Sequence, residues 1–155
     1  MAAGGPSGGA LPPLSIARDG EWRHGGEAIT HAGILTHLWE RLRVDAGGYY
    51  LEVGSGRVPV EVEDAPFVVL RVELDHGPVT VVLSDGSREE LAVATLRLGP
   101  GEVPYCRVKD GRFEARLSRA AAWQLLQAME LDEATGGAAL VLAGRRRMIP
   151  RVAPG

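Results

Sequence analysis

The adjacent carboxylates of Glu63 and Asp64 are of a type that could do acid-base chemistry. One of two paired carboxylates can donate a proton while the other accepts one, and an arginine such as Arg119 can hold an anionic substrate. In an extended chain, however, neighbouring side chains point to opposite faces, so this pair converges only at a turn or a bulge. In a structural interpretation, Asp64 accepts backbone N–H groups at the turn before Pro66, and Arg119 clamps a carboxylate. We favour the structural interpretation and keep Glu63, Asp64 and Arg119 as candidate ligand-binding residues.

The other reactive side chains do not have the spacing of a catalytic or metal site. The histidines, His24, His31, His37 and His76, lack zinc-ligand spacing, and Cys106 has no adjacent basic residue to activate it. No serine stands in a Gly-x-Ser-x-Gly turn. The segments "GSGRVP" and "GPGEVP" lack the ending of a phosphate-binding loop and the third glycine of a dinucleotide-binding motif. We therefore expect no catalytic residue, no metal and no cofactor.

Composition and charge limit the compartment and the partners. The net charge of −3 and the isoelectric point near 5.8 argue against a nucleic-acid-binding domain, which is usually basic. The single cysteine cannot form an internal disulfide, and no apolar run approaches the roughly 20 residues that span a bilayer. The first residues lack a secretory signal, and their Gly, Pro and Ser content predicts a disordered tail over residues 1–13. We expect a cytoplasmic protein without a membrane segment.

Arginines gather near the end of the chain. Residues 107–155 carry nine basic and five acidic side chains, and Arg145, Arg146 and Arg147 are consecutive. Such a cluster could attract an acidic partner or a nucleic acid. Because no aromatic residues are interleaved with the arginines, as in a base-stacking surface, we favour a solvated hairpin tip.

Two segments have helical periodicity, and short strands separated by turn residues account for most of the rest. The first helix is expected after an N-cap at Thr30, with a stripe of Ile34, Leu38 and Leu42, and Gly47-Gly48 just beyond its end. The second helix is expected after an N-cap at Ser118. Trp39 on the first helix and Trp123 on the second are expected to fill space between layers.

Several hairpins are expected between and around these helices. Residues 49–62 predict one hairpin around a Gly-Ser-Gly turn. After Pro66, the alternation of Val68, Leu70, Val72 and Leu74 predicts a strand with these four residues on one face. The segment that follows predicts an antiparallel meander.

The last third of the chain repeats the first third imperfectly. A shift of 88 residues aligns Thr30 with Ser118 and Leu38 with Leu126, and both copies have the order hairpin, helix, hairpin. The prediction is an α+β fold, mainly antiparallel β with two helices, built from two strand-helix-strand repeats. An N-terminal subdomain would cover residues 14–64. A β-rich C-terminal subdomain would cover residues 65–155, with the second repeat at 107–152.

A set of ordered segments resembles one protein family. These segments are "RDGEWRHGGEAI", "GILTHLWERL", "GGYYLEV", "VPVEVEDAPFVV", "PYCRV", "FEARLSR" and "GGAALVLAG", over roughly residues 14–152. They resemble the DUF1285 family, a bacterial group of unknown function. The resemblance implies repeated strand-helix-strand motifs, a smaller N-terminal part and a barrel-like C-terminal part. The chain differs from the family pattern at Val53–Gly56, in place of a Thr-Pro-x-Glu turn, and at "GRRRMIP".

Three hypotheses for function follow. The first is a non-catalytic regulatory or signalling module that binds a small anionic ligand or a protein partner, because turns and strands are well specified whereas no catalytic group is. The second is an enzyme with an acid-base site around Glu63, Asp64 and Arg119. The third is a structural homo-oligomer.

Overall fold

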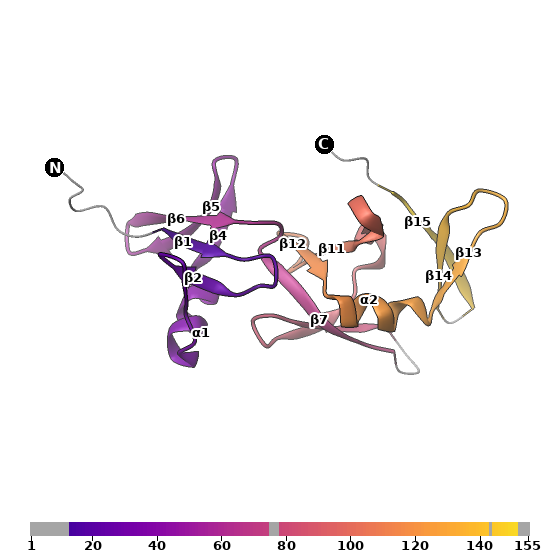
Figure 1. Cartoon of the computed structure of the whole chain (residues 1–155), viewed down its shortest axis with the longest axis horizontal. Coiled ribbons are helices and arrows are strands. Elements are labelled where there is room, and N and C mark those ends of the chain that lie inside the picture. Colours follow the sequence, from indigo (N-terminus) through magenta and orange to yellow (C-terminus); the bar gives the residue numbers. More distant parts are fainter. Residues whose placement is uncertain (1–12, 75–77, 143, 152–155) are drawn as a thin grey trace. The chain divides into compact units, whose positions relative to one another are not determined.

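The computed structural model describes residues 13–74, 78–142 and 144–151. Almost all of the predicted tail, residues 1–13, lies outside the described residues. The chain divides into two compact units, residues 1–64 (unit 1) and 65–155 (unit 2). The fold is α+β with mostly antiparallel sheets, as predicted (Figure 1).

The helices and strands are distributed over both units, with one α-helix in each. In chain order they are β1 (Leu14–Ile16), β2 (Trp22–His24), β3 (Glu27–Ala28), α1 (Ala32–Arg41), β4 (Leu42–Asp45), β5 (Gly48–Val53), β6 (Gly56–Val62), β7 (Phe67–Glu73), β8 (Thr80–Leu83), β9 (Arg88–Glu90), η1 (Val93–Thr95), β10 (Arg97–Leu98), η2 (Pro100–Glu102), β11 (Pro104–Val108), β12 (Phe113–Leu117), α2 (Arg119–Leu126), β13 (Met129–Leu131), β14 (Ala138–Leu142) and β15 (Arg145–Ile149).

Unit 1 is a six-stranded sheet in the order β3-β2-β1-β6-β5-β4 with one helix. Its neighbouring strands are antiparallel except β1 and β6, which run parallel over three residue pairs. The predicted hairpin of residues 49–62 is confirmed as β5 and β6. The core is formed by alternate apolar residues that point to one side of the strands. These residues are Ile16, Trp22, Leu42, Leu51 and Val60.

The first helix is shorter than predicted, and its cap is different. His31 is the N-cap of α1: its Nδ1 accepts a hydrogen bond from the backbone N–H of Ile34 at 3.3 Å, so the expected cap at Thr30 is wrong. The helix ends at Arg41, and the chain continues directly into β4. Leu42 is 1% exposed in the sheet, whereas Ile34 on the helix is 48% exposed. Burial of Leu42 in a strand therefore overrides the four-residue periodicity.

Unit 2 contains two sheets. The larger has the order β10-β11-β12-β7-β8-β9, and the smaller has the order β13-β14-β15. The predicted meander is confirmed in the antiparallel pairs β7-β8 and β8-β9, but β7 also pairs in parallel with β12. The two sheets are joined by a parallel bridge between Leu98 and Arg151, where the N–H of Leu98 donates to the carbonyl of Pro150 at 2.9 Å.

The predicted alternation along β7 is wrong at Leu70. Val68 and Val72 are buried, but Leu70 is 46% exposed, and Phe67 and Val69 are also buried. The pairing of β7 with β8 shifts between Val69 and Arg71. A bulge of this kind places an extra residue in one strand, so side chains beyond it change faces.

The second helix begins where the sequence predicts. The Oγ of Ser118 accepts a hydrogen bond from the N–H of Ala121 at 3.0 Å and donates to the carbonyl of Leu70 at 3.2 Å, which ties the start of α2 to β7. Ala121 and Leu125 are the buried residues of α2. The prediction that Trp123 fills a space between layers is wrong, since it is 71% exposed.

The two units share an order of elements, which supports the predicted repeat. In each unit a meander (β1-β2-β3 or β10-β11-β12) precedes the helix, and a second meander (β4-β5-β6 or β13-β14-β15) follows it. The parallel pairing of β1 with β6 corresponds to the parallel bridge between Leu98 and Arg151. Unit 2 differs because β7, β8 and β9 precede its copy of the motif.

Candidate functional site

The three predicted ligand-binding residues lie in different units. Glu63 and Asp64 are the last two residues of unit 1, and Arg119 is the first residue of α2 in unit 2. Glu63 and Asp64 thus end one unit, and Arg119 belongs to the other. Catalysis by these three residues stays a prediction.

The carboxylate of Glu63 has a structural contact. Its Oε1 accepts a hydrogen bond from the backbone N–H of Arg18 at 3.0 Å, and its own N–H donates to the carbonyl of Ile16 at 3.0 Å. Glu63 also lines a pocket of about 440 Å³ with Arg23 and Glu61. Arg23 forms an ion pair with Glu21 at 2.8 Å, so the positive charge at this pocket is already balanced. These contacts favour the structural interpretation of Glu63.

A larger pocket lies within unit 2 and has apolar walls. Its volume is about 510 Å³, within the range of small-molecule sites. One wall comes from the segment around β9 and η1, and the other comes from the hairpin of β14 and β15. The buried side chains of Val79, Leu91 and Leu140 contribute to the lining.

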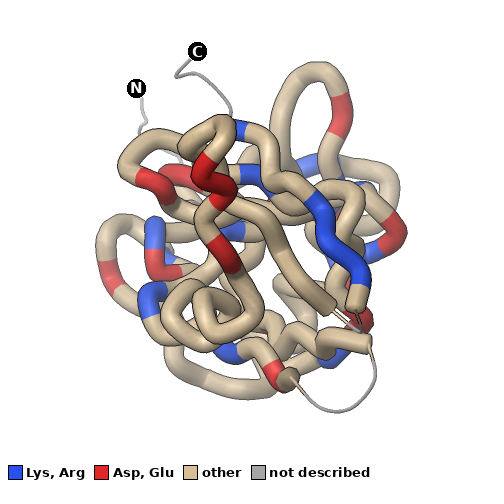
Figure 2. The backbone as a smooth tube through the Cα atoms, turned by 90° about the vertical axis from the view of Figure 1, so that its right-hand side faces the viewer, with Lys and Arg blue, Asp and Glu red and all other residues tan. Residues whose placement is uncertain are grey.

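Two arginines of β15 line this pocket. Arg145 and Arg147 are two residues apart in a strand, so their side chains point to the same face, and Arg146 points to the other. Figure 2 shows the three as one continuous blue stretch of the backbone. Arg146 forms long ion pairs with Glu130 at 3.7 Å and Asp132 at 3.9 Å. In the part of the chain that the structure describes, neither the Arg145 nor the Arg147 side chain has a hydrogen bond or an ion pair.

The equivalent strand of unit 1 has a different face. Counted from the hairpin turn, Gly56 and Val58 of β6 occupy the first and third positions, which are Arg145 and Arg147 in β15. The second position is arginine in both strands. Arg57 pairs with Asp45 at 2.5 Å and lies over the ring of Tyr50, 4.1 Å from its centroid. The second arginine thus links the last strand of each meander to acidic residues at the first strand, whereas the flanking arginines belong to unit 2 alone.

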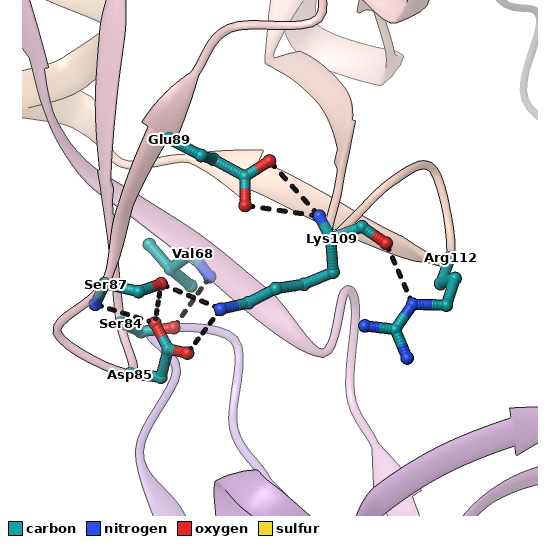
Figure 3. Close-up of polar contacts among 7 residues, drawn as sticks. All are labelled: Val68, Ser84, Asp85, Ser87, Glu89, Lys109 and Arg112. Carbon is teal, nitrogen blue, oxygen red and sulfur yellow. Dashed lines mark hydrogen bonds and ion pairs between the residues drawn. The ribbon is translucent and has the colours of Figure 1, made fainter.

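A second polar group in unit 2 surrounds Lys109, the only lysine of the chain (Figure 3). Its Nζ contacts Oδ2 of Asp85 at 2.7 Å and Oγ of Ser87 at 2.8 Å. The Oγ of Ser87 also donates to Oδ1 of Asp85 at 2.6 Å. The backbone N–H of Lys109 is shared between the two carboxylate oxygens of Glu89, each at 3.2 Å.

The geometry of this group is that of a structural clamp. Burial acts to raise the pKa of Asp85, but the hydrogen bonds from Lys109 and Ser87 outweigh it and hold that pKa below its ordinary value. An ammonium group paired with an ionised carboxylate cannot accept the proton of Ser87, as a catalytic serine-lysine pair requires. The contacts with Glu89 and Asp85 instead fix Lys109 at a turn, where it and Asp110 have left-handed backbone conformations with φ of 56° and 59°.

The remaining candidate groups give no reactive centre. Burial, with smaller effects of Glu89 and Glu114, raises the pKa of the Cys106 thiol to about 12, so it is protonated at neutral pH. Among the described residues, no three His, Cys, Asp or Glu side chains are placed to hold a metal ion. His24, His31 and His37 are exposed, and His76 lies outside the described residues. Over the same ranges, no helix has the length and apolar character to span a bilayer.

Comparison with solved structures identifies the fold of this chain. No family model and no curated protein matches the sequence. A DUF1285 family protein from Silicibacter pomeroyi DSS-3 has a similar structure, with a TM-score of 0.72 and 23% identity, over 96% of this chain and 89% of that chain. The chain has the DUF1285 fold. A DUF1285 family protein from Shewanella baltica OS155 is similar with a TM-score of 0.63 and 22% identity, over 75% of this chain and 91% of that chain.

The sequence indicated only one wall of the pocket beside β15. The arginine cluster was evident, and the i, i+2 spacing of Arg145 and Arg147 places both on one face of a strand. The opposite wall, around Leu91 and Val93, is about fifty residues earlier in the chain. No local pattern predicts that these two segments of the DUF1285 fold lie across one pocket.

Proposed function

We propose that this chain is a bacterial, cytoplasmic member of the DUF1285 family and acts as a non-catalytic binding module. Its ligand would be a small molecule with an anionic group and an apolar body, bound in the unit 2 pocket. The observation that carries this proposal is the pair of unpartnered guanidinium groups, Arg145 and Arg147, beside buried apolar side chains.

Arginine suits this role for a physical reason. Its planar group of N–H donors matches the oxygens of a carboxylate or phosphate, and two such groups on one face can bind the same anion from two sides. The apolar walls favour a ligand whose body removes their surface from water, at roughly 25 cal/mol per Å² buried. A regulatory role follows if the bound ligand changes the stability of unit 2, because a ligand that binds only the folded state stabilises it.

The test uses octyl phosphate and octanoate as probes on the full chain, with isothermal titration calorimetry and thermal unfolding as readouts. A probe at a hundred times its dissociation constant should stabilise the folded protein by about 2.7 kcal/mol. We expect the double variant Arg145→Gln/Arg147→Gln to weaken binding by at least about tenfold, since two charge-assisted contacts are lost.

Arg146→Gln is the control, because it removes one positive charge from the same strand on its other face. It should bind both probes as the unmodified chain does. The proposal is overturned if neither probe binds at millimolar concentration. It is also overturned if Arg146→Gln weakens binding as much as the double variant does.

A further inference from the structure

The pocket in unit 2 is lined by charged side chains of both signs that have no partner among the described residues. The facing segments of its two walls are β9 and β15, and each carries three consecutive charged residues. Arg88 of β9 pairs with Glu73 at 3.2 Å, Glu89 accepts from the N–H of Lys109, and Arg146 of β15 pairs with Glu130. These three residues do not line the pocket.

The other three charged residues of the two strands all line the pocket. They are Glu90, Arg145 and Arg147. Within the described ranges, the Glu90 carboxylate has neither a hydrogen bond nor an ion pair, so it does not reach the arginines across the pocket. The space between the two walls therefore separates one negative charge from two positive ones.

We infer that the ligand of this pocket is dipolar, with a cationic amino group at one end, an anionic carboxylate or phosphate at the other, and an apolar chain between them. This inference rests on the proposed function of the same pocket. The anionic end would bind Arg145 and Arg147, and the amino group would bind Glu90. An anion without an amino group would leave Glu90 unpaired and repelled by the ligand charge, which disfavours purely anionic ligands.

The alternation of side chains between the two faces of each strand determines which charged groups face the ligand. Side chains at i and i+2 share a face, so the same face of β15 presents both arginines, and Glu90 points away from the contact that Glu89 makes with Lys109. Leu91 and Leu140 are buried beside these charges and offer an apolar surface for the chain between the two ends of the ligand. A ligand of the right length would satisfy all three charged side chains at once.

The experiment compares two series of probes by isothermal titration calorimetry at low ionic strength. One series is hexanoate, octanoate and decanoate, and the other is 6-aminohexanoate, 8-aminooctanoate and 10-aminodecanoate. We expect at least one amino acid to bind about threefold or more tighter than its matched fatty acid, as for a partly exposed ion pair. Glu90→Gln should abolish that advantage and leave the affinity for fatty acids the same or higher.

Glu130→Gln is the control, since it removes a carboxylate from β13 that does not line the pocket. It should leave the preference for the amino acid unchanged. The dipolar inference is overturned if no amino acid binds tighter than its fatty acid, or if Glu90→Gln leaves the preference intact. In that result, binding of fatty acids that is lost in Arg145→Gln/Arg147→Gln would still support the proposed function. Absence of binding by every probe, octyl phosphate included, would overturn both.

Discussion

Units 1 and 2 contain the same motif, which consists of a meander, a helix and a second meander. The two copies differ in how the first and last strands of the motif pair with each other. In unit 1 the first and last strands run parallel over three residue pairs, Leu14 with Val60, Ser15 with Glu61 and Ile16 with Val62, so the two meanders form one sheet. In unit 2, within the described residues, the corresponding contact is the bridge of Leu98 with Arg151, and the second meander is a separate sheet.

This difference explains why the larger pocket lies in unit 2. The additional strands β7, β8 and β9 extend the sheet of unit 2, and the separate sheet of β13 to β15 provides a second wall facing the segment around β9. The first and third positions of the last strand differ accordingly. They are Gly56 and Val58 in unit 1 and arginines in unit 2. One repeated motif can therefore be a closed sheet in one copy and the wall of a pocket in the other.

The largest expected effect concerns the cores of the two copies. Leu51 and Leu140 occupy equivalent places in β5 and β14, and their exposed fractions are 4% and 1%. Replacement of either by alanine should lower the free energy of unfolding by about 3 kcal/mol, because a buried leucine leaves a cavity. Hydrogen exchange should show faster exchange in residues 14–64 for Leu51→Ala and in residues 65–151 for Leu140→Ala.

If either substitution accelerated exchange equally in both units, the two copies would unfold together, and their comparison as separate structures would fail. Leu70→Ala is the control, since Leu70 is 46% exposed in β7 and its loss should change exchange little.

The second prediction compares an ion pair that is largely buried with an exposed one. In Lys109→Met, Asp85, whose side chain is 14% exposed, loses its cation. We expect the free energy of unfolding to fall by about 2 kcal/mol, since a carboxylate left without its partner is costly. Arg57→Met removes the exposed partner of Asp45 in unit 1 and should lower the free energy of unfolding much less than Lys109→Met does. Equal losses in urea unfolding would contradict the difference in burial.

The third prediction compares the two helix caps. Ser118→Ala removes the hydroxyl that accepts a hydrogen bond from the N–H of Ala121 and should lower the free energy of unfolding by about 1 kcal/mol. His31→Ala should cost less, because its hydrogen bond to Ile34 is longer, at 3.3 Å, and no residue of α1 is buried. Thermal unfolding of the two variants measures the difference, and Ser118→Thr should restore most of the loss. A larger loss for His31→Ala would show that α1 contributes more to stability than its exposure indicates.

The smallest expected effect is the dependence of unit 2 stability on acid. The pKa of Asp85 is lowered on folding, so its stabilising contribution is complete above the ordinary value of 3.8. That contribution is lost as the pH falls below 3.8 through the lowered pKa of the folded state, where protonation of Asp85 breaks its contact with Lys109. The urea midpoint should therefore fall less between about pH 5 and about pH 2.5 in Lys109→Met than in the unmodified chain. Equal changes would exclude Asp85 as a source of acid sensitivity.

Local patterns in the sequence predict the order of the elements well. The turns around Gly54 and Gly86, the hairpin of residues 49–62 and the cap at Ser118 depend on residues close together in the chain, and the structure shows each of them. The strand-helix-strand repeat was also sufficient to predict the fold, because two copies with similar turn and cap residues form similar meanders. The candidate site residues Glu63, Asp64 and Arg119 were chosen by residue type alone, and residue type carries no information about which segments meet.

Local sequence patterns were enough to indicate the α+β class, the two copies of the motif and the concentration of arginine on one late strand. Burial of individual side chains depends instead on how distant segments pack. This packing places Leu42 in a sheet, brings Leu70 to the surface at a bulge and leaves Trp123 exposed. The same packing brings Glu90, Arg145 and Arg147 to one pocket. Helices, turns and caps can be predicted because they depend on hydrogen bonds between near neighbours, whereas burial and pockets depend on packing between segments far apart in the chain.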